Sequence, residues 1–362
     1  MSATRPVRVA LVIGQLTAGG AEGQLWMLCR GIDRRLVEPV VYCLSKRTQP
    51  HREQIEAANV PVRVISGSRM SRVRALRRWL REDRIDAVHA WLFIANAYAW
   101  AANRGSGRPL LTSARNCKRQ GRVLDWFNRR AFAASDRVVV NSQEVAHYIA
   151  REYGAPAERT TVIYNAIDTE RFHPTADTAG DELCVVMVGR LVPQKNPGLF
   201  VSAAAALRQR VPNVRFVLIG DGPMRPWIEQ EIAAAGLRDR CVVTGERHDV
   251  PELLRQADLF WLTSNWEGLP NVVLEAMASG LPVVVTDVGG AHELVRSGEE
   301  GFLVQAGDQT GLVEHSVALL SDAERRRQFA RAARARAEAF APALMIAATQ
   351  DLYAQVMQRP RS

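Results

Sequence analysis

The sequence predicts an α/β protein with two Rossmann-like domains, each built on a doubly wound parallel sheet. Its 362 residues, 47% hydrophobic and 23% charged, suffice for two domains with a core each. Short apolar runs bounded by Gly, Pro, Asn and Asp recur through both halves, and segments with helical spacing separate them. This alternation is typical of βαβ units, in which helices cover parallel strands.

We expect residues 1–175 to form the first domain. Its predicted strands are Val7–Ile13, Val37–Leu44, Pro61–Ile65, Ala87–His89, Leu110–Ser113, Val138–Asn141 and Thr161–Ile163. Its predicted helices are Ala21–Ile32, Arg72–Glu82, Ile94–Arg104, Val123–Ala134 and Gln143–Glu152. The stretch from Phe172 to Asp181 has no apolar periodicity, which predicts the linker between the domains.

We expect residues 181–342 to form the second domain. Its predicted strands are Leu183–Val188, Arg215–Ile219, Val242–Thr244, Leu259–Leu262, Val283–Thr286 and Phe302–Val304. The last part is predicted to be helical, at Asp308–Leu320, Ala323–Phe340 and, after a break at Pro342, Leu344–Met357. Because ligands of open α/β sheets bind outside the carboxyl ends of the strands, a cleft between the two sheets is the expected site.

Composition excludes several classes of protein. The longest apolar runs are too short to span a bilayer, and the chain enters a strand without a secretory pattern. Five cysteines, odd in number and without a CxxC pair, are typical of reduced thiols in a cytoplasm. No Asp-x-Asp pair and no cluster with metal-ligand spacing occurs, so we expect no metal and no other cofactor.

Positive charge is concentrated in the first half. Residues 1–170 contain 27 Lys and Arg against 15 Asp and Glu, whereas the whole chain has a net charge of +9. One basic amphipathic segment contains Arg69, Arg72, Arg74, Arg77, Arg78, Arg81 and Arg84, and another contains Arg115, Lys118, Arg119, Arg122, Arg129 and Arg130. Both are typical of segments that lie on an anionic membrane, although ordinary solvated faces are the alternative. No nucleic-acid-binding motif accompanies the charge, so no nucleic-acid partner is expected.

The stretch from Ser264 to Gly290 is the strongest functional signal. Pro270 suits the first turn of a short helix that ends at Gly280. The amides of that first turn, around Leu269, Pro270, Asn271 and Val272, form an anion site because helix N-terminal amides lack internal partners. Glu275 lies about 8 Å further along the helix, the reach from a phosphate to a ribose. Glu267, in the preceding turn, is placed to meet a sugar.

The string EGLPNVVLEAMASGLPVVVTDVGG within this stretch resembles the signature of family 4 glycosyltransferases, also called glycosyl transferases group 1. The resemblance implies a GT-B fold, a nucleoside-diphosphate sugar donor linked to UDP or GDP, and retention of anomeric configuration. It also implies that the last helix, 344–358, packs on the first domain. We expect a bacterial polysaccharide or lipopolysaccharide enzyme.

The motif VGRLVPQKN supplies two cations. In the family, the positions of Arg190 and Lys195 contact the donor diphosphate, and cations there stabilise the charge on the leaving group. Lys195 is one of only three lysines, which indicates a need for a compact charge. With Glu267 they form our predicted catalytic set.

Other motifs extend the predicted donor site. GQLTAGGAEGQ opens the first helix, and the resemblance carries Gly19 and Gly20 over as phosphate contacts. Gly220 and Gly222 in IGDGPMR are expected to let the nucleoside approach. The backbone of Arg247 and His248 is expected to border the base.

The predicted acceptor side is His89, Asn96 and Arg115. His89 ends a strand, where a lone histidine can equally be a structural hydrogen-bond donor. Arg115 stands where many relatives have a histidine, and an arginine cannot act as a base at neutral pH. We expect it to contact the acceptor or the donor electrostatically.

The sequence therefore predicts a cytoplasmic enzyme, peripheral on the inner face of the membrane, that moves a sugar from a nucleotide sugar to a saccharide or a polyprenyl- or other lipid-linked acceptor. A nucleotide-sugar epimerase and a non-catalytic binding protein remain alternatives. A phosphorylase is disfavoured because it needs a pyridoxal lysine and only three lysines are present.

Overall fold

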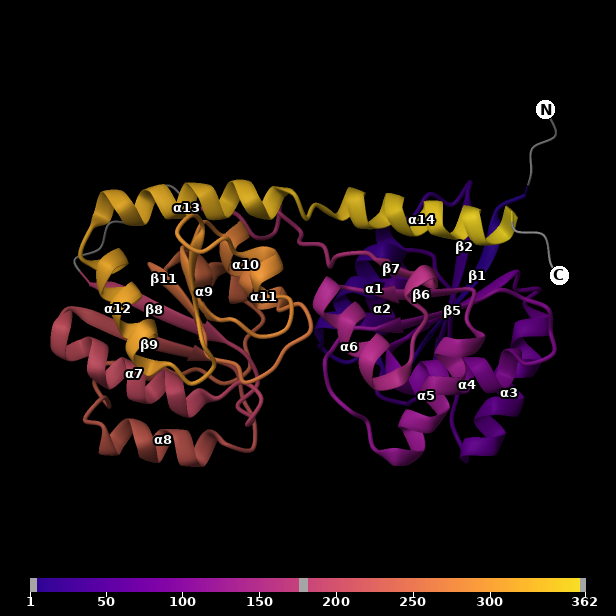
Figure 1. Cartoon of the computed structure of the whole chain (residues 1–362), viewed down its shortest axis with the longest axis horizontal. Coiled ribbons are helices and arrows are strands. Elements are labelled where there is room, and N and C mark those ends of the chain that lie inside the picture. The colour runs from indigo at the N-terminus through magenta and orange to yellow at the C-terminus, as the bar shows by residue number, and fades with distance from the viewer. Residues whose placement is uncertain (1–4, 176–181, 359–362) are drawn as a thin grey trace. The chain divides into compact units, whose positions relative to one another are not determined.

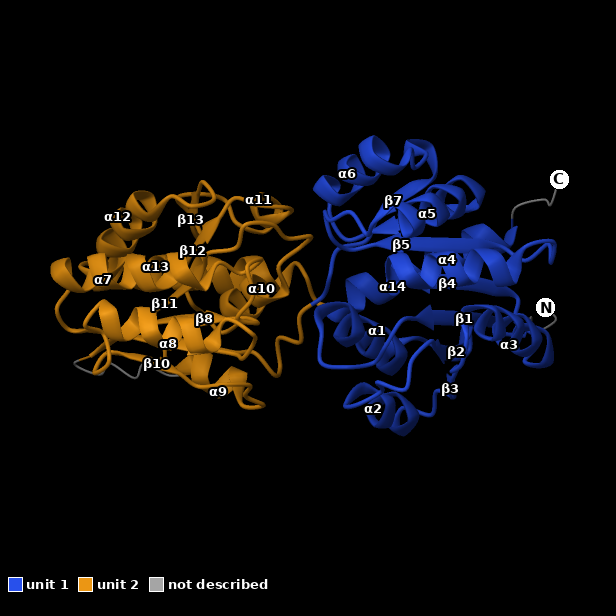
Figure 2. Ribbon diagram, turned by 90° about the horizontal axis from the view of Figure 1, so that it is seen from below, with its two compact units in different colours: residues 1–166, 342–362 blue, residues 167–341 orange. Residues whose placement is uncertain are grey.

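The computed structural model describes residues 5–175 and 182–358 (Figure 1). The chain divides into two compact units, residues 1–166 with 342–362 and residues 167–341 (Figure 2). The division precedes the domain boundary predicted at 175, because Ile167 and Phe172 are buried in the core of the second unit. The amide of Ile167 also donates to the Phe340 carbonyl oxygen. Residues 176–181 of the predicted linker lie outside the described residues.

The sheet of the first unit is entirely parallel, with strand order β3-β2-β1-β4-β5-β6-β7. Its strands are β1 Val7–Ile13, β2 Val37–Cys43, β3 Val62–Val64, β4 Ala87–Trp91, β5 Leu110–Ala114, β6 Arg137–Val140 and β7 Thr160–Val162. The order reverses between β1 and β4. The carboxyl ends of these two strands are therefore where this type of sheet binds ligands.

Helices cover both faces of this sheet. They are α1 Gly20–Gly31, α2 His51–Ala57, α3 Arg69–Glu82, α4 Leu92–Asn103, α5 Arg122–Ala134, α6 Gln143–Tyr153, the 3-10 turn Ala157–Arg159, and α14 Pro342–Gln358. On one face Leu11 packs with Leu25 of α1, Ile55 of α2 and Leu352 of α14. Helices α3 and α4 pack on the other. Helix α2 was not predicted. Pro342 was predicted to separate two helices, with the last one starting at Leu344, but it is itself the first residue of α14, as proline's fixed φ permits.

The second unit has a six-stranded parallel sheet of order β10-β9-β8-β11-β12-β13. Its strands are β8 Leu183–Val188, β9 Val214–Ile219, β10 Cys241–Val243, β11 Leu259–Leu262, β12 Val283–Thr286 and β13 Gly301–Val304. Its helices are α7 Pro197–Arg210, α8 Arg225–Ala234, α9 Val250–Arg255, α10 Asn271–Ala278, α11 Ala291–Leu294, α12 Gln309–Leu320 and α13 Ala323–Glu338. Here the order reverses between β8 and β11.

Strand β8 shows why the strands of this sheet can be predicted from the sequence. Val185 and Met187 pack on one side with α7 and α12, and Val186 packs on the other with α10. Side chains alternate between two buried faces, so the strand is a continuous apolar run. Within residues 5–175 and 182–358, no helix is long and apolar enough to cross a membrane.

Candidate functional site

The loops that follow β8 and β11 bring a lysine and a glutamate together at the strand reversal of the second sheet. Lys195 Nζ lies 2.6 Å from Glu267 Oε1. Both side chains are largely withdrawn from water, since 14% of the lysine and 9% of the glutamate side chain are exposed. Their mutual charge compensates for part of the desolvation that each suffers. The sequence predicted both residues as catalytic but did not predict their contact.

Polar groups from the same two loops hold Glu267 in place. The Ser264 hydroxyl donates to Glu267 Oε1 at 2.7 Å, and Gln194 Nε2 lies 3.1 Å from the Trp266 carbonyl oxygen. Thr263 donates to the Lys195 carbonyl oxygen at 2.8 Å. Sequence reasoning missed these supporting residues, although Thr263 and Ser264 directly follow a buried strand.

Close packing against the backbone of Glu267 requires a glycine at position 289. Gly289 has φ +57°, and a Cβ there would lie 2.6 Å from the carbonyl oxygens of Glu267 and Gly268. The amide of Gly290 donates to the Gly268 carbonyl oxygen. The Gly-Gly loop after β12 therefore packs directly against the backbone that carries Glu267.

Arg190 differs from Lys195 although both follow β8. It is exposed, and its side chain forms no ion pair or hydrogen bond with any residue in the described ranges. Its guanidinium is therefore available to an anion.

Helix α10 supplies the second carboxylate. Its N-cap is Pro270, which has no side-chain acceptor to cap the first turn. Glu275 lies in the next turn, and burial raises the pKa of its carboxyl group to about 7, against the opposing effect of Arg171 and then of Lys195. Within the described residues its carboxylate accepts no hydrogen bond. It is therefore a partly buried acceptor that can take hydrogen bonds from the donors of a ligand.

Leu269, Pro270, Asn271 and Val272 occupy the start of α10 as predicted by the motif. Leu269 is buried, so any contribution it makes to a ligand is through its backbone. Arg171, which sequence reasoning missed, is exposed and stacks on Phe172 with its guanidinium carbon 5.3 Å from the ring centroid.

The glycines after β9, which were predicted to let the nucleoside approach, are also required by the packing of the protein itself. A Cβ at Gly220 would overlap the Gly189 carbonyl oxygen, and one at Gly222 would overlap the backbone of Leu191. They are small because their own chain approaches closely, and a nucleoside contact is not needed to explain them.

The residues predicted to border the base lie at the surface. The Arg247 side chain is exposed and its Nε donates to Asp249 Oδ1 at 2.8 Å, and His248 is also exposed. Their position is compatible with the backbone contact that the motif predicts.

In the first unit, the predicted glycines open α1 directly after the carboxyl end of β1. Gly19 is the N-cap and Gly20 the first helical residue, and both are exposed. A Cβ at Gly19 would overlap the Glu22 carboxylate. The two glycines are thus at the surface, with the Glu22 carboxylate beside the helix start.

His89 and Asn96, which were predicted on the acceptor side, are buried and hydrogen-bonded to other groups of the protein. His89 is 1% exposed, its Nδ1 lies 2.7 Å from the Tyr353 hydroxyl, and its Nε2 lies 2.8 Å from the Ser113 hydroxyl. Burial lowers its pKa to about 3. Asn96, which is 0% exposed, donates to the Ser113 carbonyl oxygen and accepts from the Ser113 amide. Both residues join neighbouring strands and helices.

Arg115 directly follows β5, at the carboxyl edge of the first sheet. Its Cζ is 4.1 Å from the centroid of the Trp91 ring, and one terminal nitrogen donates to Asn165 Oδ1 at 2.8 Å. Burial lowers the pKa of its guanidinium to about 10.

These features define a class of protein. Two doubly wound parallel sheets carry charged side chains near the carboxyl ends of their strands, where open α/β sheets bind their ligands. Within residues 5–175 and 182–358, no three His, Cys, Asp or Glu side chains are grouped to hold a metal ion.

Comparison with known proteins makes the class specific. The family model for glycosyl transferases group 1 matches residues 168–336, and that for glycosyltransferase family 4 matches residues 18–171. A D-inositol 3-phosphate glycosyltransferase of Xylanimonas cellulosilytica is 30% identical over 308 residues, which are 76% of this chain and 73% of that protein. The chain therefore belongs to the family 4 glycosyltransferases and is a glycosyltransferase enzyme.

Two further proteins are informative. The UDP-Gal:alpha-D-GlcNAc-diphosphoundecaprenol alpha-1,3-galactosyltransferase of Escherichia coli is 28% identical over 275 residues, covering 70% of this chain and 71% of that protein. The crystal structure of Anabaena Alr3699/HepE in complex with UDP superposes with a TM-score of 0.86 at 24% identity, covering 96% of this chain and 100% of that one. This likeness identifies the GT-B fold.

Proposed function

We propose that the protein transfers a sugar, with retention of configuration, from a UDP- or GDP-sugar to a saccharide or lipid-linked acceptor in the synthesis of cell-surface polysaccharide or lipopolysaccharide. The observation that carries the proposal is the cluster of Arg190, Lys195, Glu267 and Glu275 at the strand reversal of the second sheet. The E. coli relative, by its name, acts on a lipid-linked diphosphate acceptor, and the Anabaena structure holds UDP.

Each residue of the cluster has a chemical task in this proposal. Breaking the glycosidic bond leaves negative charge on the diphosphate, which Arg190 and Lys195 stabilise together with the amides that start α10. Glu267 fixes Lys195 by their 2.6 Å contact. Glu275 accepts hydrogen bonds from ribose hydroxyls, which favour its ionised form.

The acceptor hydroxyl loses its proton as it attacks. We propose that the leaving diphosphate accepts this proton on the same face of the sugar, because His89 is buried and both its ring nitrogens are engaged. We also propose that the reaction needs no metal ion, since guanidinium, ammonium and helix amides already supply positive charge.

The test is mass spectrometry of products formed from a panel of UDP- and GDP-sugars with diphosphate-lipid and free saccharide acceptors, with and without EDTA. We expect one donor to give a product with an added sugar of retained configuration, insensitive to EDTA. Isomerised donor without any transfer would contradict the proposal.

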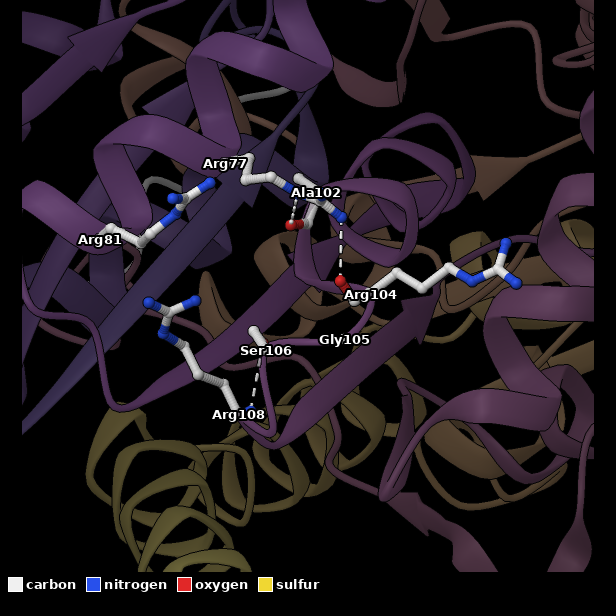
Figure 3. A pocket seen from close by; sticks show the side chains of 7 residues that line it. All are labelled: Arg77, Arg81, Ala102, Arg104, Gly105, Ser106 and Arg108. Carbon is white, nitrogen blue, oxygen red and sulfur yellow. Dashed lines mark hydrogen bonds between the residues drawn. The ribbon is translucent and has the colours of Figure 1, made fainter.

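We further propose that the first unit binds the inner face of the cytoplasmic membrane. A pocket of about 290 Å³ on this unit is lined by Arg77, Arg81, Ala102, Arg104, Gly105, Ser106 and Arg108. No carboxylate lines it, and Figure 3 shows the guanidinium groups of Arg81 and Arg108 on either side of it. Burial and then the charge of Arg81 lower the pKa of Arg108. An anionic headgroup suits such a pocket.

Exposed apolar residues of the same unit support membrane contact. Trp126 is 49% exposed and Val123 is 67% exposed, and Trp126 packs edge-on with Trp100. Arg104, which also lines the pocket, lies over Trp100. Aromatic side chains beside arginines are typical of surfaces at the lipid headgroup level.

Co-sedimentation with vesicles tests membrane binding. We expect binding to vesicles containing phosphatidylglycerol, loss at high salt, and weakening by Arg81→Glu or Trp126→Ser. Arg238→Glu, an exposed arginine of the second unit, is the matched control. Equal binding to neutral and anionic vesicles would contradict this part of the proposal.

A further inference from the structure

Unpartnered polar atoms are concentrated at the carboxyl edge of the first sheet. In residues 5–175 and 182–358, buried side-chain atoms without a hydrogen-bond partner include Trp91 Nε1, Arg115 Nε, Asn116 Oδ1 and Asn141 Oδ1. The remaining one, Arg8 Nε, lies 3.2 Å from a Glu38 oxygen and is thus paired in charge. Because buried polar groups are normally satisfied, a cluster of exceptions calls for a ligand.

Topology brings these residues together. Trp91 ends β4, and Arg115 directly follows Ala114, whose register partner is Val140 of β6. Asn141 directly follows Val140, so Arg115 and Asn141 stand side by side beyond the ends of β5 and β6. Arg115 also stacks on Trp91, at 4.1 Å from its ring centroid.

The layer beneath is satisfied, which shows that the edge is not simply badly packed. There His89 contacts both Tyr353 and Ser113, and Asn96 contacts both the amide and the carbonyl of Ser113. The atoms without a hydrogen-bond partner lie just beyond this layer, toward the carboxyl ends of the strands.

Arg115 carries a charge that nothing in the protein balances. It contacts the neutral amide of Asn165 and the Trp91 ring, and no carboxylate in the described ranges pairs with it. Arg115 is half-buried with its Nε atom out of contact with water, and an unpaired charge in such a place is costly to the folded state. An anionic ligand would reduce this cost.

We infer that this cluster, Trp91, Arg115, Asn116 and Asn141, binds the phosphoryl group of a glycosyl phosphate acceptor. Arg115 Nε–H and Trp91 Nε1–H are donors suited to phosphate oxygens, and the two asparagine oxygens are acceptors suited to sugar hydroxyls. The assignment to the acceptor rests on the proposed function. Binding of an anion by this cluster does not.

The donor diphosphate is the other source of a phosphoryl group. We assign the cluster to the acceptor because the second unit already supplies Arg190, Lys195 and the start of α10 for the donor. The two sources are separated by measuring pyrophosphate binding with UDP present at saturation.

The experiment is isothermal titration of inorganic pyrophosphate into UDP-saturated protein, with variants Arg115→Met, Trp91→Phe and Arg122→Met. Methionine keeps apolar contact with Trp91, phenylalanine keeps the ring face but removes the N–H, and Arg122 is a nearby exposed arginine that serves as control. We expect pyrophosphate affinity to fall at least tenfold in Arg115→Met, to weaken in Trp91→Phe, and to be unchanged in Arg122→Met. UDP affinity should stay the same in all three.

Thermal unfolding without ligand separates binding from structure. If Arg115 serves a ligand, Arg115→Met unfolds at the same or a higher temperature than the wild type, because an uncompensated charge is gone. A lower unfolding temperature with pyrophosphate binding intact would make Arg115 structural and overturn the inference. A tenfold loss of UDP affinity would assign it to the donor instead. Failure of the wild type to bind UDP would contradict the proposed function. Pyrophosphate binding would still test whether the cluster binds an anion, because that part of the inference does not depend on the donor.

Discussion

Arg190 and Lys195 follow the same strand, yet only Lys195 is tied to a carboxylate of the protein. We predict that Arg190→Ala changes the free energy of unfolding by less than about 0.5 kcal/mol, because the side chain is exposed and unpaired with described residues. Transfer should nevertheless fall by about 10²–10³-fold, since the cation acts on the leaving group. Urea unfolding and initial rates measure the two effects. Arg238→Ala is the exposed control, and a full transfer rate in Arg190→Ala would refute its role.

Glu275 links proton binding to stability. Its folded-state pKa of about 7 lies above the ordinary 4.5, so between these values the folded chain holds a proton that the unfolded chain has released. The stability contributed by this carboxyl therefore declines as pH rises through that window. We predict that Glu275→Gln gains in unfolding temperature relative to wild type, more at pH 8 than at pH 5.

The same variant should bind UDP about ten- to a hundredfold more weakly at pH 8, because hydrogen bonds to a charged acceptor contribute roughly 1.5–3 kcal/mol. Calorimetric titration at pH 6 and pH 8 measures this. Equal affinity of the two proteins at pH 8 would remove Glu275 from the donor site.

Contacts between side chains could not be predicted from the sequence. Glu267 and Lys195 were singled out separately, but their contact depends on two loops meeting at a strand reversal, which no local pattern encodes. The burial of His89 could not be predicted, because its partner Tyr353 comes from the far end of the chain. Burial of a polar residue is a property of tertiary packing.

Among the elements, the Gly-Gly loop after β12 positions the site by steric fit. Gly289 and Gly236 have similar positive φ angles, +57° and +67°, but only at Gly289 would a Cβ meet other atoms. We predict that Gly236→Ala costs about 1 kcal/mol of backbone strain and leaves transfer unchanged. Gly289→Ala should cost more and also slow transfer, because it displaces the backbone of Glu267. Equal effects of the two variants on rate would contradict this.

Strands were predicted closely because both faces of each parallel sheet are buried, which makes each strand an apolar run. Helix α2 was missed because only Ile55 of its seven residues is buried, so it shows no apolar stripe. The start of α14 was misplaced because proline ends a helix from within but is favourable in its first turn.

On the scale of the whole molecule, the last helix, α14, belongs to the first unit. Met345, Leu352, Tyr353 and Val356 of this helix are buried in the core of the first unit. We predict that deleting residues 342–362 destabilises the first unit by several kcal/mol, since each large buried apolar side chain contributes about 1.5–3 kcal/mol. Hydrogen exchange in β1 and α1 should accelerate, whereas exchange in β8 and β11 should not. Uniform acceleration would contradict the assignment of α14 to one unit.

The two-domain GT-B fold was predicted from length, alternation of elements and one long motif, and the comparisons confirm it. The acceptor could not be predicted, because it depends on buried atoms such as Arg115 Nε whose lack of a partner appears only in three dimensions. A donor site shared between the two units remains a prediction.

The most direct test of the central claim is a crystal structure of the protein with UDP. We predict that the ribose hydroxyls lie within hydrogen-bond distance of the Glu275 carboxylate, and that the diphosphate contacts Arg190, Lys195 and the first turn of α10. UDP bound away from α10, with Glu275 still without a partner, would contradict the account.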